Sequence, residues 1–190
     1  YGDMGCYSFF PTKNLGCFGD GGLVVVRSKK NYDILKKLRT HGGIRRNQHD
    51  LIGYNSRLDE IQAAILNIKL DFIESFIKKR KIIADMYCKT ISNDKVRLPF
   101  TSKKSVHTFN QFTIRVKNRR KLELHLKKHK IPYGIYYSMP MYKYNAYKNN
   151  NYQPLPMAEK VSKECLSIPI YPELPIKHVI KICEVLNNYE

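Results

Sequence analysis

The pattern of apolar and polar positions predicts two strands and a helix in the first part of the chain. Apolar runs typical of strands extend from Cys6 to Phe10 and from Leu23 to Val26, with a glycine-rich loop, Pro11 to Gly22, between them. The second run is unbroken and mostly β-branched, which is typical of a strand buried on both faces. The segment from Asn31 to Arg39 then shows the spacing of a short helix.

The most regular periodicity begins near Ser56. Apolar residues recur there at spacings of three and four, as in an amphipathic helix, at Leu58, Ile61, Ile65, Ile68 and Phe72. Ser56, followed three residues later by Asp59, resembles a capping box, so Ser56 is expected to cap this helix. Helical structure is expected to continue, with a bend, to about Cys88.

The remainder of the chain mixes strands and helices. Extended segments are expected at 96–99, 111–116 and 135–137, helices at 122–130, 156–166 and 175–189, and a loop at 140–156. The pattern therefore predicts an α/β fold in two parts. An α/β segment, residues 1–75, precedes a small α+β domain, residues 76–190.

Composition indicates a folded chain without a membrane span. Hydrophobic residues make up 43% of the sequence, and no apolar run reaches the roughly 18 residues that a span requires. Five cysteines without paired spacing favour reduced thiols, and hence a cytoplasmic location. The histidines have no carboxylate or cysteine partner at ligand spacing, so no metal site is expected.

The formal net charge of +18 allows two interpretations. One is a nucleic-acid-binding protein, and the other is a lysine-rich solvated surface. The lysines are spread along the chain, and no nucleic-acid-binding motif accompanies them. We therefore expect no nucleic-acid partner, although the positive charge could attract phosphorylated substrates.

Two clusters could carry chemistry, and the first, SFFPTKNLGCFGDGG, surrounds Lys13. A lysine in a loop directly after a buried strand can be desolvated, which lowers its pKa and makes its amine nucleophilic toward an aldehyde. Ser8, five residues earlier, could form a hydrogen bond with a phosphate group. The alternative is a glycine-rich turn that serves only the geometry of the chain.

The second cluster, GYNSRLDEIQAA, places Asn55, Ser56 and Arg57 where the long helix is expected to begin. Free backbone N–H groups, the helix dipole and a fixed cation together make an anion site. The alternative is simple capping beside a surface arginine.

In order and spacing, the two clusters resemble the DegT/DnrJ/EryC1/StrS family of nucleotide-sugar aminotransferases. The resemblance continues through IPYGIYYSMPMYKYNAY and LSIPIYPEL, so it covers nearly the whole chain. It implies the C-terminal part of the fold-type I aminotransferase fold, which binds pyridoxal 5'-phosphate. Residues 1–75 would then be a remnant of the large parallel-sheet domain, and residues 76–190 the small domain. The family's cofactor-binding aspartate would precede Tyr1, so the 190 residues alone are expected to be inactive.

The resemblance also assigns roles to single residues. Lys13 matches the lysine that holds the cofactor as a Schiff base and moves the proton during transamination. Ser8 matches a serine that binds the cofactor phosphate. Asn55 and Arg57 match residues that reach this phosphate from the other subunit, which implies a homodimer with shared active sites.

The resemblance places substrate contacts at Tyr136 and Tyr137, although the family often has histidine at the first of these positions. The sequence is most similar to enzymes that transfer an amino group, usually from L-glutamate, to C3 of a UDP-linked 3-keto-2-acetamido-glucuronate. Such enzymes serve lipopolysaccharide and other cell-surface polysaccharide synthesis. The alternatives are an aminotransferase for a dTDP- or GDP-linked keto sugar, or an inactive dimerisation fragment. Related dehydratases usually carry histidine where Lys13 stands, which argues against that activity.

Overall fold

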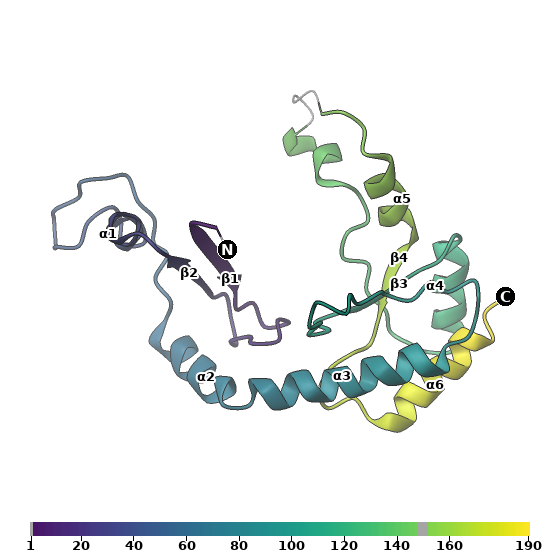
Figure 1. The fold of residues 1–190 in the computed structure, drawn as a ribbon. Coiled ribbons are helices and arrows are strands. Elements are labelled where there is room, and N and C mark those ends of the chain that lie inside the picture. Colours follow the sequence, from purple (N-terminus) through teal and green to yellow (C-terminus); the bar gives the residue numbers. More distant parts are fainter. Residues whose placement is uncertain (1, 148–151) are drawn as a thin grey trace. The chain divides into compact units, whose positions relative to one another are not determined.

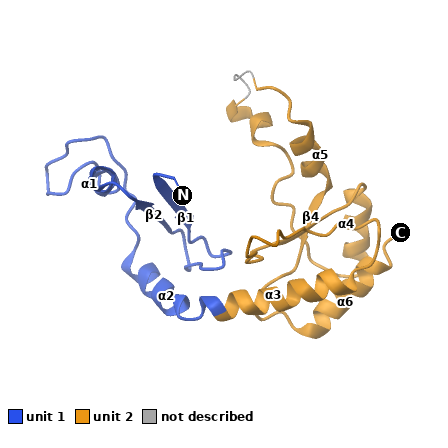
Figure 2. Ribbon diagram, in the orientation of Figure 1, with its two compact units in different colours: residues 1–74 blue, residues 75–190 orange. Residues whose placement is uncertain are grey.

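The computed structural model describes residues 2–147 and 152–190, and the chain divides into two compact units, residues 1–74 and 75–190 (Figure 2). The boundary expected after residue 75 lies one residue from this division. That the first unit belongs to a larger cofactor-binding domain stays a prediction. The centre of the loop expected at 140–156 lies outside the described residues.

Unit 1 contains one antiparallel strand pair and two helices. Strands β1 (Met4–Ser8) and β2 (Gly22–Val26) run side by side, with Ser8 opposite Gly22 (Figure 1). Helix α1 (Lys29–Leu38) begins after Ser28, whose hydroxyl accepts a hydrogen bond from the Asn31 N–H. Helix α2 (Glu60–Leu70) follows a long loop. No parallel strand pair occurs among the residues that the structure describes.

Strand β2 is much more exposed than the sequence predicts. Leu23, Val24 and Val25 are 48%, 45% and 43% exposed, so the expectation of burial on both faces is wrong for this chain. The reason is that β2 has one strand neighbour, β1, in a sheet of two strands. An apolar cavity of about 470 Å³ lies between β2, α1 and residues 54–58. Unit 1 therefore has little core of its own.

Unit 2 contains a well-developed core. Its elements are α3 (Ile73–Thr90), β3 (Phe112–Arg115), α4 (Arg119–Lys128), two short 3-10 turns (Met141–Lys143 and Asn145–Tyr147), α5 (Pro156–Glu164), β4 (Cys165–Ile168) and α6 (Ile176–Asn187). Strands β3 and β4 pair antiparallel, with Phe112 opposite Ile168. The largest fully buried side chains of this core are Tyr87, Phe112, Ile114, Leu122, Leu126, Leu166 and Leu186.

Three details of the predicted elements are wrong. The long helix begins after Asp59, not Ser56, and in place of the expected bend it is interrupted at residues 71 and 72. The segment 135–137 forms no strand, because only Gly134 bridges to β4, through Ser167. The helix expected at 156–166 ends at Glu164, since Cys165 is already extended and begins β4. Pairing with β3 there outweighs the helical pattern.

Candidate functional site

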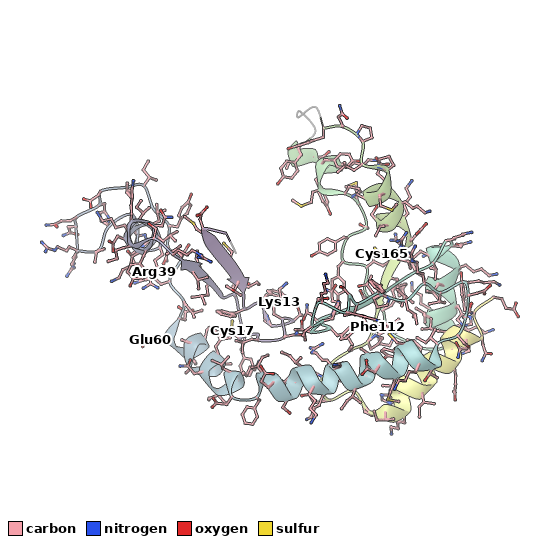
Figure 3. All side chains as sticks on the ribbon, viewed as in Figure 1. Lys13, Cys17, Arg39, Glu60, Phe112 and Cys165 are labelled. Carbon is pink, nitrogen blue, oxygen red and sulfur yellow. The ribbon has the colours of Figure 1, made fainter. Side chains whose placement is uncertain are left out.

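The loop between β1 and β2, which carries Lys13, is held by its own backbone. The N–H groups of Phe9 and Cys17 donate to Gly21 and Phe9 carbonyl oxygens, at 2.8 and 2.9 Å. The buried Cys17 thiol donates to the carbonyl oxygens of Phe9 and Gly19, at 3.0 Å each. Figure 3 labels Cys17 and Lys13 in this loop. The Lys13 N–H donates to the Phe10 carbonyl oxygen at 2.9 Å. The loop thus has a defined shape although it lies at the surface.

Helix α2 adds two further bonds to this loop. The Gln62 side-chain oxygen accepts the Phe18 N–H at 2.8 Å, and the Lys69 ammonium donates to the Gly16 carbonyl oxygen at 2.6 Å. The Lys69 ammonium also lies 4.6 Å from the centre of the Phe18 ring, a cation–π distance. Because Gln62 and Lys69 both belong to a regular helix, α2 determines where the loop lies.

The Lys13 and Ser8 side chains are both exposed. Ser8 Oγ accepts the Phe10 N–H at 3.3 Å, so the hydroxyl hydrogen stays available to another group. The expectation that a buried strand would desolvate Lys13 is wrong for this chain, because β1 and β2 are themselves exposed. The amine and the hydroxyl are therefore open to a ligand at the same strand end.

Asn55 and Arg57 lie ahead of α2 and not at its N-terminus. Asn55 pairs with Thr40 in an antiparallel bridge, and the Ser56 N–H donates to the Arg39 carbonyl oxygen at 3.0 Å. The expected placement of these residues at the start of the helix is wrong, because α2 begins only at Glu60. Asn55 and Arg57 are both exposed. Among the described residues, no hydrogen bond or ion pair joins either of them to Lys13 or Ser8.

Tyr136 and Tyr137 occupy different surroundings in unit 2. Tyr136 lines a cavity of about 300 Å³, whose other walls are residues 110–111, 132–134 and 167–171. Its ring lies directly over Gly134, where an added Cβ would come within 2.9 Å of ring atom Cε2. Tyr137 is 70% exposed and does not line this cavity. The structure therefore separates the two tyrosines that the sequence treats as a pair.

Arg80 is a residue that the sequence analysis missed. It lies on the buried face of α3 with Ile83, Ala84 and Tyr87, at helical spacings of three, four and seven. Its Nη1 atom donates to the carbonyl oxygens of residues that line the Tyr136 cavity. A charged residue on an otherwise apolar helical stripe was the signal that could have identified it.

The described part of the chain contains neither a candidate metal site nor a helix that could span a membrane. No group of three histidine, cysteine or acidic side chains is arranged to hold a metal ion there. Nor does any helix in residues 2–147 and 152–190 combine the length and apolar character needed to cross a bilayer.

The sequence profile described as the DegT/DnrJ/EryC1/StrS aminotransferase family matches residues 1–187. The chain belongs to this family. The match includes the Lys13 loop and the segment with Asn55 and Arg57. It also includes both units, apart from the last three residues of unit 2.

Curated members of the DegT/DnrJ/EryC1/StrS family are similar to this chain over nearly all of its length. A UDP-N-acetyl-3-dehydro-alpha-D-glucosamine 3-aminotransferase from Acidithiobacillus ferrooxidans is 36% identical, over 99% of this chain and 51% of the relative. A UDP-2-acetamido-2-deoxy-3-oxo-D-glucuronate aminotransferase from Pseudomonas aeruginosa is 33% identical, over 97% and 51%. Other relatives are named for dTDP- and GDP-linked sugars. The chain spans about half the length of the curated relatives it matches.

Solved structures of the family share the fold. A crystal structure of DesV from S. venezuelae, in complex with a ketimine intermediate, matches with a TM-score of 0.93 and 33% identity, over 98% of this chain and 51% of DesV. The expected fold class, the C-terminal part of this aminotransferase fold, is confirmed.

Proposed function

We propose that this chain is part of a pyridoxal-phosphate-dependent enzyme that transfers an amino group to a keto carbon of a nucleotide-linked sugar. The observation that carries the proposal is the Lys13 amine. It is exposed on a loop whose backbone is held by Cys17 and α2, in a chain that belongs to the aminotransferase family. An accessible amine at a fixed position is what attachment to an aldehyde requires.

The groups at the end of β1 fit this cofactor. Lys13 offers a primary amine for the aldehyde, and Ser8 offers a hydroxyl that can donate to the phosphate. An amide from Asn55 and a guanidinium from Arg57 suit the same phosphate, and we assign them to it from a second subunit. When bound, pyridoxal phosphate supplies an electron sink for the carbon that gains or loses the amino group.

Lys13 would have two tasks. Its Nζ atom holds the cofactor, and after release the same atom accepts a proton and returns it. Proton transfer near neutral pH requires an amine that is partly shielded from water. Because Lys13 is exposed in this chain, we assign that shielding to the bound groups and to the second subunit of a homodimer.

The preferred substrate is a UDP-linked 2-acetamido-3-keto sugar, in the glucuronate form, with L-glutamate as amino donor. The names of the two UDP-sugar relatives support the position of the keto group, and sugars linked to dTDP or GDP are the alternatives. The product would enter cell-surface polysaccharide synthesis. The five free cysteines support a reducing, cytoplasmic setting.

An amination assay tests the proposal. The enzyme of which this chain is part is incubated with pyridoxal phosphate, isotopically labelled glutamate and keto sugars linked to UDP, dTDP or GDP, and mass spectrometry detects label in the sugar. We expect Lys13→Ala to lower the rate by about a thousandfold or more, since it removes the attachment point and the base. Lys29→Ala is the matched control, because Lys29 is an exposed lysine that pairs with Asp33 on α1. Unchanged labelling in Lys13→Ala would show that Lys13 is not the catalytic lysine, whereas no labelling with any sugar would leave the non-catalytic dimerisation role.

A further inference from the structure

Arg80 on α3 is a buried cation surrounded by backbone carbonyl groups. The residue is 8% exposed, and its Nη1 atom donates to the carbonyl oxygens of Phe109, Asn110 and Ile170, at 3.2, 3.3 and 2.8 Å. Phe109 and Asn110 precede β3, whereas Ile170 follows β4. One guanidinium thus joins two loops that lie 60 residues apart in the sequence.

These two loops form walls of the cavity that Tyr136 lines. Asn110 and Ile170 both belong to the cavity wall. A further wall of the cavity, residues 132–134, is joined to β4, because the backbones of Gly134 and Ser167 exchange hydrogen bonds of 2.9 and 2.8 Å. Since Tyr136 lies over Gly134, the position of its ring depends on the same framework.

The loop before β3 needs such a restraint. Phe109 has a φ of 46°, in the left-handed region that residues with a Cβ seldom occupy. Its N–H donates to Nδ1 of His107 at 2.9 Å, and the two rings stack with centroids 4.2 Å apart. The Arg80 bond to the Phe109 carbonyl oxygen adds a third contact that favours this turn.

Burial of an arginine is a costly way to gain stability alone. Desolvation lowers the pKa of Arg80, and the charge of Glu173 only partly opposes this effect. An apolar side chain would continue the buried stripe of Ile83 and Tyr87 without that cost. The cation is therefore better explained by the backbone groups that it holds in place.

The cavity itself has an uncharged lining. Its residues are asparagine, glutamine, serine, glycine, proline, isoleucine and three tyrosines, in a chain with a net charge of +18. Tyrosine rings and amide groups suit the hydroxyl and acetamido groups of a sugar, and no cation faces a phosphate there.

We propose that Arg80 is a positioning residue, which holds the two loops so that Tyr136 and the cavity receive the uncharged groups of the sugar. The part of this proposal that concerns sugar binding depends on the proposed function. The part that concerns geometry does not, and it can be measured separately.

A tryptophan reporter measures the geometry. The chain contains no tryptophan, so Tyr136→Trp introduces a single tryptophan at the cavity, which is excited selectively over the tyrosines. We expect Arg80→Met, in this background, to shift the emission to longer wavelength and to increase quenching by acrylamide by about twofold. Arg80→Lys keeps the charge and three donors on a shorter reach, so it should restore part of the parent signal. Arg115→Met is the matched control, because Arg115 pairs with Glu164 at 2.7 Å outside the cavity.

Steady-state kinetics measure the consequence for substrate. In the active protein, Arg80→Met should raise KM for the nucleotide sugar about tenfold, while kcat and KM for glutamate change by about twofold or less. A general loss of structure would instead lower the active fraction and hence kcat. Arg80→Lys should recover part of the change in KM.

The outcomes separate the two proposals. If Arg80→Met leaves emission and quenching of the reporter unchanged, or if Arg115→Met changes them equally, Arg80 does not position the cavity. If Arg80→Met fails to fold, the same two measurements on Arg80→Lys decide. Emission and quenching equal to those of the parent would contradict a requirement for the guanidinium group. Failure of pyridoxal phosphate to attach to Lys13 overturns the proposed function, and the reporter result stands independently of it.

Discussion

The ammonium group of Lys69 on α2 lies 2.6 Å from the carbonyl oxygen of Gly16, in the loop that carries Lys13. This bond joins residues 53 positions apart and brings the helix and the loop together. Gln62, two turns earlier on the same side of α2, accepts the N–H of Phe18 at 2.8 Å. The backbone of the loop that carries Lys13 is therefore held by α2 as well as by the loop itself.

Replacement of Lys69 tests this dependence. Lys69→Met removes the bond to Gly16 and the cation over the Phe18 ring, while it keeps the length of the side chain. We expect affinity for pyridoxal phosphate to fall about tenfold, equivalent to roughly 1.4 kcal/mol, as for a hydrogen bond to a charged group. Lys69→Arg should keep most of the affinity. Equal cofactor affinity in Lys69→Met and the parent would show that α2 does not position the loop.

The backbone at Gly16 leaves no room for a side chain. A Cβ there would lie 2.7 Å from the Pro11 carbonyl oxygen and 2.8 Å from that of Phe10, and neither backbone group can move freely. Gly16→Ala should therefore distort the loop and destabilise the protein by about 1–3 kcal/mol, measured by urea unfolding. Gly19→Ala is the control, since its Cβ would meet only the flexible end of Gln62, at 3.1 Å. A cost for Gly19→Ala as large as that for Gly16→Ala would contradict the distinction.

Gly134 supports the Tyr136 ring. In Gly134→Ala, the added Cβ would lie 2.9 Å from ring atom Cε2 of Tyr136 and 3.1 Å from its hydroxyl oxygen, so the ring has to turn away. Because Tyr136 is 57% exposed, it can do so at low cost, and we expect stability within about 0.5 kcal/mol of the parent. KM for the nucleotide sugar should rise several-fold. In a double-mutant cycle, Gly134→Ala should cause no further rise in KM when Tyr136→Ala is already present. Additive effects on KM would show that Gly134 does not act through Tyr136.

Stability should depend on pH through Cys183. Burial raises the pKa of its thiol from 9.0 to about 11. Between these values the unfolded chain loses the thiol proton while the folded chain keeps it, so the free energy of unfolding falls as pH rises from 9.0 to about 11. Burial also raises the pKa of Tyr87, which adds to the loss at higher pH. In Cys183→Ala, the free energy of unfolding, measured by urea titration at each pH, should fall less steeply as pH rises. An unchanged dependence on pH would exclude a contribution from Cys183.

Periodicity predicted most of the helices because their apolar stripes are regular. The segment 119–128 and the last helix both form close to where they were expected, with buried residues such as Leu122, Leu126 and Val179 on one side. Strand β4 escaped prediction because Cys165–Ile168 continues an apolar pattern that also fits a helix. Only the distant partner strand β3 decides between the two, and local spacing carries no information about it.

The candidate site was predicted unevenly for a similar reason. Lys13 and Ser8 stand out through a motif; in the structure Ser8 ends β1, Lys13 lies in the loop that follows, and both residues are exposed. The helix start assigned to Ser56 was wrong, because residues 54–56 pair with the end of α1 and delay the helix. The role of Arg80 depends on carbonyl groups up to 90 positions away, which no local pattern could supply.

Location of the cofactor tests the central claim most directly. The protein is mixed with pyridoxal phosphate, reduced with borohydride and digested, and mass spectrometry finds the lysine that carries the pyridoxyl group. The predicted result is one group per chain, on Lys13, with none in Lys13→Ala and little on the exposed control Lys29. A label spread evenly over surface lysines, or one that is equally abundant in Lys13→Ala, would show that Lys13 is not the cofactor lysine.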